Sequence, residues 1–147
     1  KNISPTFGGI NLEDIKAPEA FEIERRLVDE LDIPVMHDDQ HGTAIISGAA
    51  LINALELANK KIGGIKMVIC GAGAAAISCA KMYKSLGVKK KNILMFDSKG
   101  LINVNRKDLS LEKKLFASKN VEIESLADAI NGSDVFIGLS KADMMSK

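Results

Sequence analysis

The stretch "KMVICGAGAAAISCAKMYKSLG" constrains the fold of this chain more than any other part of its sequence. An apolar run ends at Cys70, glycines follow at Gly71 and Gly73, and a helix of small residues comes next. A buried strand, a glycine turn and a helix in this order are typical of the dinucleotide-binding fingerprint, here with Ala76 in the third glycine position. Gly71 would allow the tight turn, Gly73 the close approach of a pyrophosphate, and Ala76 close packing of helix against strand.

A second apolar run, "KNILMFDSKG", follows the helix and ends in the carboxylate of Asp97. A dinucleotide fold places an acid at this point to accept the ribose hydroxyls, and a carboxylate favours NAD because it repels a 2′-phosphate. Lys99 could instead pair with that phosphate, so NADP stays open as the cofactor. The alternative to a cofactor site is a glycine turn that serves packing alone.

Runs of strand length alternate with helical periodicity along the chain, which predicts a doubly wound parallel α/β sheet of the Rossmann-like kind with an incomplete second half. Strands are expected at 7–12, 33–36, 65–70, 92–97 and 135–138, with a strand or edge segment near 120–124. Helices are expected from Pro18 to about 31, over 43–59, after the glycine turn as far as Gly87, over 110–118, and before Gly132. We divide the chain into a metal- and substrate-site segment with short strands (1–42), a connecting buried helix (43–60) and a partial NAD(P)-binding domain (61–147).

Composition narrows the class of protein. The 147 residues are 46% hydrophobic and carry a net charge of only +1, which suits one globular core and gives no basic field for nucleic acid or an anionic membrane. No segment reaches the roughly 18 to 20 apolar residues that span a bilayer. Cys70 and Cys79 lie in apolar contexts and are expected to be reduced core residues. We therefore expect a soluble, cytoplasmic protein without nucleic-acid or membrane partners.

Two pairs of carboxylates, Glu13-Asp14 and Asp38-Asp39, stand where predicted strands stop. The carboxyl ends of parallel strands share one edge of a sheet, and ligands bind at that edge. Carboxylates gathered there would repel one another unless a cation intervened. Oxygen ligands select a hard divalent ion, so the pattern favours Mg²⁺ or Mn²⁺.

Two other interpretations of the same stretch stay open. His37 and His41 are four residues apart and could bind zinc or iron if they lay on one helical face, although Pro34 favours an extended chain around His37. Asp38 or Asp39 could also simply cap the helix expected from Thr43, which would stabilise it by about 1 kcal/mol.

The motifs "FGGINLEDI", "IPVMHDDQHGTA", "GAGAAA" before "LMFDSKG", and "DVFIGLS" resemble, in order and spacing, the bacterial type of malic enzyme. That family comprises metal-dependent, NAD(P)-linked oxidative decarboxylases of malate. The resemblance extends over nearly the whole chain. The first two motifs are specific to the family, whereas the glycine turn occurs in many unrelated enzymes.

The resemblance implies a role for each matching residue. Metal ligands would be Glu13, Asp14 and Asp39, and Asp38 would lie beside the catalytic lysine. The cofactor residues would be Thr43 near the cofactor, the pyrophosphate-binding turn of Gly71, Ala72, Gly73, Ala74, Ala75 and Ala76, the ribose-binding Asp97 with Ser98, and Gly138 to Ser140 on the nicotinamide side. The resemblance further implies malate and pyruvate as substrate and product, NAD with NADP as the alternative, Mg²⁺ or Mn²⁺, and a homodimer of the full-length protein.

The implied mechanism needs groups that the matching motifs do not contain. In the family, a base removes the hydroxyl proton of malate as hydride passes to the nicotinamide, the ion polarises the new carbonyl so that carbon dioxide leaves, and an acid protonates the enol. The acid and base are a tyrosine and a lysine that precede "FGGINLED", and we interpret Tyr83, the sole tyrosine, as a packing residue. Because the chain starts at Lys1 without a methionine, only a few residues before this motif, we expect an internal fragment, and because it lacks that tyrosine and lysine, we expect it to be inactive. The rival hypotheses are a non-catalytic dinucleotide-sensing module and another Rossmann dehydrogenase.

Overall fold

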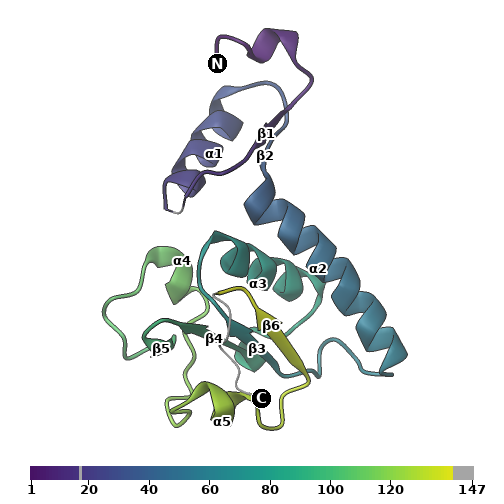
Figure 1. Ribbon diagram of the computed structural model, residues 1–147, viewed down its shortest axis with the longest axis vertical. Helices are drawn as coiled ribbons and strands as arrows, with labels where there is room; N and C mark the ends of the chain where they lie inside the picture. The colour runs from purple at the N-terminus through teal and green to yellow at the C-terminus, as the bar shows by residue number, and fades with distance from the viewer. Residues whose placement is uncertain (17, 141–147) are drawn as a thin grey trace.

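The computed structural model describes residues 1–16 and 18–140, which form two sheets joined by a long helix (Figure 1). The first sheet pairs β1 (Ile10–Leu12) with β2 (Val35–His37), and α1 (Glu19–Glu30) connects them. The second sheet has the order β5-β4-β3-β6 and contains β3 (Met67–Cys70), β4 (Ile93–Asp97), β5 (Gly100–Leu101) and β6 (Val135–Gly138). The remaining elements are the 3-10 helices η1 (Ser4–Thr6) and η2 (Lys90–Asn92) and the α-helices α2 (Asp38–Leu57), α3 (Ala74–Leu86), α4 (Leu111–Lys114) and α5 (Leu126–Ile130).

The second sheet confirms the predicted parallel α/β class. Strand β3 pairs in parallel with β4 and with β6, as expected for strands joined by crossover helices. Strand β5 is the exception, because the chain turns back after Asp97 through Gly100, which has φ +105° in the left-handed region, and pairs antiparallel with β4. The expected strand near 120–124 does not form, and the amide of Glu122 instead donates to the side chain of Asn120.

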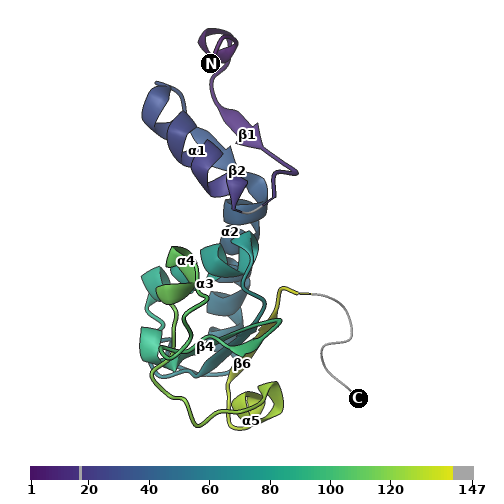
Figure 2. The ribbon, with the colours of Figure 1, turned by 90° about the vertical axis from the view of Figure 1, so that its left-hand side faces the viewer.

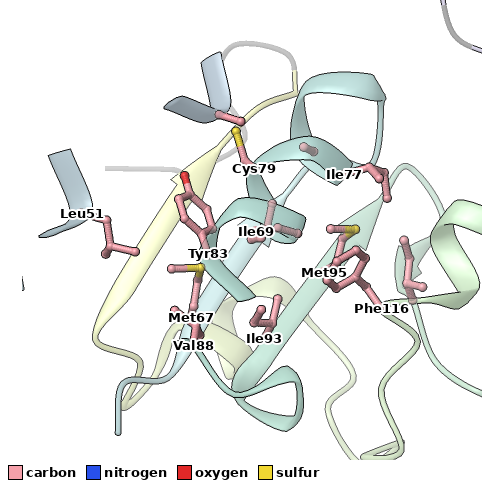
Figure 3. Packing of buried hydrophobic residues seen from close by; sticks show 14 of the residues in the cluster. Leu51, Met67, Ile69, Ile77, Cys79, Tyr83, Val88, Ile93, Met95 and Phe116 are labelled. Atoms are coloured by element: carbon pink, nitrogen blue, oxygen red, sulfur yellow. The ribbon is translucent and has the colours of Figure 1, made fainter. Parts of the chain in front are cut away.

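Alternate residues of the central strands face two different cores. Met67 and Ile69 of β3 belong to the larger core with α2 and α3, shown in Figure 3, whereas Val68 packs with Phe96 in the smaller core under α5. Figure 2 shows α3 and α4 on one side of the sheet and α5 on the other. The predicted winding over both faces is thus present, with one short helix on the second face.

Two differences from expectation concern α2. It begins at Asp38, five residues before the expected Thr43, because the extended His37 is its N-cap and the acids of the next two positions suit the positive end of the helix dipole. It is also buried on one side only. Ile46 is 73% exposed and Leu57 is 90% exposed, because among the described residues α3 is the element that packs most extensively along the helix.

The remaining expectations about the core are confirmed. Cys70 and Cys79 are free and buried, and Tyr83 is fully buried in the core beside α2 (Figure 3). Helix α3 ends as predicted at Gly87, which adopts φ +118°. Within residues 1–16 and 18–140, no helix has the length and apolar character needed to cross a membrane.

Candidate cofactor and metal site

The glycine turn follows β3 as the sequence predicts. Gly71 has φ +129°, its amide donates to the carbonyl of Phe96 at 2.8 Å, and a side chain at this position would collide with the backbone of Leu139. Gly73 is the N-cap of α3, and a Cβ added there would meet no atom within 4 Å. The turn is therefore closed at Gly71 against the residues that follow β6 and open at Gly73, where a ligand could approach the backbone.

A cavity of about 550 Å³ lies at this turn. Its lining contains six of the sequence-predicted cofactor residues, Gly71, Ala72, Gly73, Asp97, Ser98 and Ser140, together with Cys70, Phe96, Lys113 and Leu139. The cavity stands at the carboxyl ends of β3, β4 and β6, where open parallel sheets bind ligands. The amino terminus of α3, which has no side-chain cap, offers unpaired N–H groups to a phosphate at the same place.

The other predicted cofactor residues lie outside that lining. Ala76 is buried in the core and packs α3 against the sheet, which is the role expected of the third position of the fingerprint. Ala74 and Ala75 form the first turn of α3, and Gly138 is the last residue of β6. Thr43 lies in the second turn of α2, away from the cavity walls.

Asp97 is the centre of an ion cluster that sequence reasoning missed. Both carboxylate oxygens accept from the guanidinium of Arg106, at 2.8 and 3.0 Å, and one also accepts from the Lys113 ammonium at 2.7 Å. The Lys99 amide donates to the other oxygen at 3.0 Å, and the Lys99 side chain pairs with Asp108 at 2.7 Å. The dense charges of 97–114 were the available signal, but their pairing was not visible in the sequence.

The cluster determines the ionisation of Asp97, whose side chain is 9% exposed. Burial by itself would raise the pKa of this carboxyl group, but the hydrogen bonds from Arg106, Lys113 and the Lys99 amide outweigh it and lower the pKa to about 2. The hydrogen bonds that Arg106 donates to Asp108 and Asp97 in turn raise the pKa of Arg106 above its ordinary value. Asp97 is therefore a carboxylate at neutral pH, with its acceptor positions already in use.

The four strand-end carboxylates lie at one edge of the first sheet. Leu12 of β1 is in register with His37 of β2, so Glu13-Asp14 and Asp38-Asp39 follow neighbouring strand ends. Asp14 has φ +56°, an uncommon conformation that aspartate tolerates. The shared edge is what the sequence predicted.

The side chains at this edge are not assembled into a metal site. Within 1–16 and 18–140, no group of three or more His, Cys, Asp or Glu side chains could hold a metal ion. Glu13 accepts instead from the side-chain Nδ2 of Asn11 at 3.0 Å, and Asp38 and Asp39 lie in the first turn of α2 rather than capping it. The chain by itself therefore supplies the predicted oxygen donors at one edge without bringing them together.

Glu24 of α1 holds the start of α2 in place, which sequence reasoning also missed. Its carboxylate accepts from the His37 amide at 2.9 Å, from Gln40 Nε2 at 3.3 Å and from His41 Nε2 at 2.8 Å. Those three donors lie on both sides of the Asp38-Asp39 pair. His41 therefore pairs with Glu24. The His37 ring is fully buried, and its nitrogens have no hydrogen-bond partner among the described residues.

The fold and the cavity define a Rossmann-type dinucleotide-binding unit, and comparison with known proteins narrows the class. The family model described as "Malic enzyme, NAD binding domain" matches residues 40–145. This chain belongs to the malic enzyme family, through its NAD-binding domain.

Individual relatives agree with this membership. The chain is 51% identical to the NADP-dependent malic enzyme of Halomonas elongata, over 99% of this chain and 34% of that protein. It is 52% identical to the NAD-dependent malic enzyme of Rhizobium meliloti, over 97% of this chain and 19% of that protein. The crystal structure of the NAD-dependent malic enzyme from Thermotoga maritima superposes with a TM-score of 0.88 at 43% identity, covering 99% of this chain and 40% of that one. The chain thus spans a fifth to two fifths of these relatives.

Proposed function

We propose that this chain is the cofactor-binding part of an oxidoreductase that converts malate into pyruvate and carbon dioxide while it reduces NAD(P)⁺. The observation that carries this proposal is the glycine turn, which is open at Gly73 and lines a cavity together with Asp97. The names of the relatives support malate as substrate, and they favour this function over a sensing module or another Rossmann dehydrogenase.

In this proposal the cofactor lies along the carboxyl edge of the second sheet. The turn from Gly71 to Ala76 holds the pyrophosphate, Asp97 and Ser98 lie by the adenosine ribose, and Gly138 to Ser140 lie on the nicotinamide side. Thr43 would approach the cofactor from α2. A bound nicotinamide cofactor would supply the hydride acceptor for malate oxidation, and these residues would bind and orient it.

The ion cluster supports NADP as well as NAD. The Asp97 oxygens already accept from Arg106 and Lys113, so the carboxylate is less available to a ribose hydroxyl and repels a 2′-phosphate less. Lys113 also lines the cavity and offers a cation to that phosphate. The argument from Asp97 for NAD alone is therefore weakened by its neighbours.

Cofactor binding can be tested by filling the open side of the turn. Gly73→Val should leave the chain folded, because no chain atom lies where the new side chain begins, at a cost of about 1 kcal/mol for valine at the N-cap. It should weaken NAD⁺ and NADP⁺ binding by at least about tenfold, since the glycine permits close approach of the pyrophosphate. Calorimetric titration measures both constants. Gly8→Val is the matched control, as Gly8 is equally unobstructed but lies outside the cavity. Equal nucleotide affinity of the two variants would contradict the assigned cradle.

We also propose that Glu13, Asp14 and Asp39 are ligands of Mg²⁺ or Mn²⁺, with Asp38 beside the reacting groups. Support comes from the register that puts both carboxylate pairs at one edge, although the side chains are not assembled in this chain. Asp39→Asn should weaken Mn²⁺ binding by at least about tenfold, as expected on loss of a charged ligand, measured by electron paramagnetic resonance. Asp32→Asn, an exposed acid before β2, is the control. Undiminished Mn²⁺ affinity in Asp39→Asn would refute the ligand set.

A further inference from the structure

A second cavity lies at the amino end of β4, whereas the cofactor cavity lies at its carboxyl end. Its volume is about 620 Å³ and its lining contains Ile93, the first residue of β4. Asp97, at the other end of the strand, lines the cofactor cavity. At the usual rise per residue of a strand the two positions are about 13 Å apart, so a ligand in one cavity does not occupy the other.

Positive charge dominates this second cavity. Four lysines line it, Lys90, Lys91, Lys114 and Lys119, and the lining contains no carboxylate. The other lining residues are Ile93, Val104, Ala117, Ser118 and Asn120. We call this group the lysine cavity.

The lysines of this cavity are unpaired within the described part of the chain. None of the four takes part in an ion pair, whereas Lys60, Lys99 and Lys113 each pair with an aspartate. The chain as a whole has 20 basic and 19 acidic residues, so a shortage of acids does not explain the imbalance. Like charges gathered in one place repel, and a bound anion removes that repulsion.

The walls of the lysine cavity are fixed by hydrogen bonds of three separate segments. The Ser118 amide donates to Ile102 and the Val104 amide donates to Ser118, both at 2.9 Å. The side-chain Nδ2 of Asn92, at the end of η2, donates to the carbonyl of Ile65 at 3.0 Å, and Phe116 is buried between the segments that carry Lys114 and Lys119. The four lysines therefore lie on segments that are fixed by hydrogen bonds and packing around one cavity.

We propose that the lysine cavity binds a polyphosphate group, either as a free anion or as the phosphate chain of a nucleotide. Lysine ammonium groups bind phosphate as point charges, and charge-assisted hydrogen bonds of this type are strong. Several lysines around one cavity suit a ligand that carries several negative charges better than a ligand with a single carboxylate group. The site is separate from the cofactor cavity and does not depend on the activity proposed above.

The test is a calorimetric titration of the chain with tripolyphosphate, with and without saturating NAD⁺. We expect one site whose affinity NAD⁺ does not change. The double variant Lys114→Gln and Lys119→Gln should weaken binding by at least about tenfold, because two charge-assisted contacts are lost. The control is Lys84→Gln with Lys107→Gln, which removes two exposed lysines outside this cavity and should leave the affinity unchanged.

Two results would overturn the proposal. Displacement of tripolyphosphate by NAD⁺ would place the anion in the cofactor cavity. Equal weakening by the two double variants would mean general attraction to a solvated lysine surface. ATP is titrated in parallel, since tighter binding of ATP than of tripolyphosphate assigns the site to nucleotides and equal binding assigns it to the phosphate chain alone.

Discussion

At the scale of single residues, the neighbours of Asp97 change the function that its position in the motif predicts. Taken alone, an acid at the end of the second strand is a ribose acceptor that selects NAD. In the structure it is held by Arg106 and Lys113 and is nearly buried. The same carboxylate therefore anchors the chain segment that forms one wall of the cofactor cavity.

Asp97 should contribute stability that depends on pH. Its folded-state pKa of about 2 lies below its ordinary 3.8, so this contribution is fully present above about pH 5 and is lost as the pH falls from about 4 towards 2. Asp97→Asn should lower the free energy of unfolding at neutral pH by about 2 kcal/mol. Urea unfolding of both proteins measures this difference, which should shrink as the pH falls. A difference that stays constant between pH 6 and pH 3 would contradict the assigned ion cluster.

Lys113 should influence the choice between the two cofactors. Lys113→Gln should weaken NADP⁺ binding relative to NAD⁺ by about tenfold, the equivalent of about 1.4 kcal/mol, because a cation near the 2′-phosphate is removed. The ratio of the two dissociation constants is the measurement. Lys114→Gln is the control, since the neighbouring lysine lines the other cavity. An unchanged ratio in Lys113→Gln would rule out this role.

At the scale of elements, the contact between α2 and α3 holds the connecting helix to the nucleotide-binding sheet. Leu51 and Leu55 of α2 belong to the same core as α3. Gly48 permits the close approach, because a Cβ there would be 3.1 Å from Met82 Cγ and 3.3 Å from Leu86 Cδ1. Small residues in the long helix thus set the distance between the two helices.

Gly48→Val should therefore destabilise the fold by about 1 to 3 kcal/mol, the usual cost of overpacking. The matched control is Ala49→Val, which introduces the same side chain at an exposed position of the same helix. Thermal unfolding of both variants measures the effect. If Gly48→Val unfolds at the same temperature as Ala49→Val, the two helices are not in close contact at this position.

At the scale of the whole molecule, the chain is a nucleotide-binding unit in which α2 is exposed along one side. The exposed side of α2 carries Ile45, Ile46 and Ile52, each at least 47% exposed. The chain spans 34% of the Halomonas elongata relative and 19% of the Rhizobium meliloti relative. We therefore expect the complete active site in proteins of the relatives' full length, not in this chain alone.

The chain alone should not oxidise malate. The family resemblance assigns one acid or base role to a tyrosine, and the sole tyrosine, Tyr83, is fully buried in the core, where burial raises its pKa. Formation of NADH or NADPH from malate in the presence of Mn²⁺ is the measurement, with the full-length Halomonas elongata enzyme as positive control. Measurable turnover by the 147-residue chain would refute this expectation.

The sequence by itself determined the local parts of the molecule. The strand, glycine turn and helix around Gly71 and Gly73, the stop at Gly87, and the strand ending in Asp97 follow from turn chemistry and apolar periodicity within short windows. The parallel order of the strands followed from their alternation with helices.

Only the tertiary structure decided which charges meet. Arg106 and Lys113 reach Asp97 across 9 and 16 residues of chain, and Glu24 reaches Gln40 across 16. The start of α2 and its one-sided burial were also fixed by what packs nearby. Periodicity reports which face of an element is apolar, whereas these contacts depend on the path of the chain between elements, which no local pattern contains.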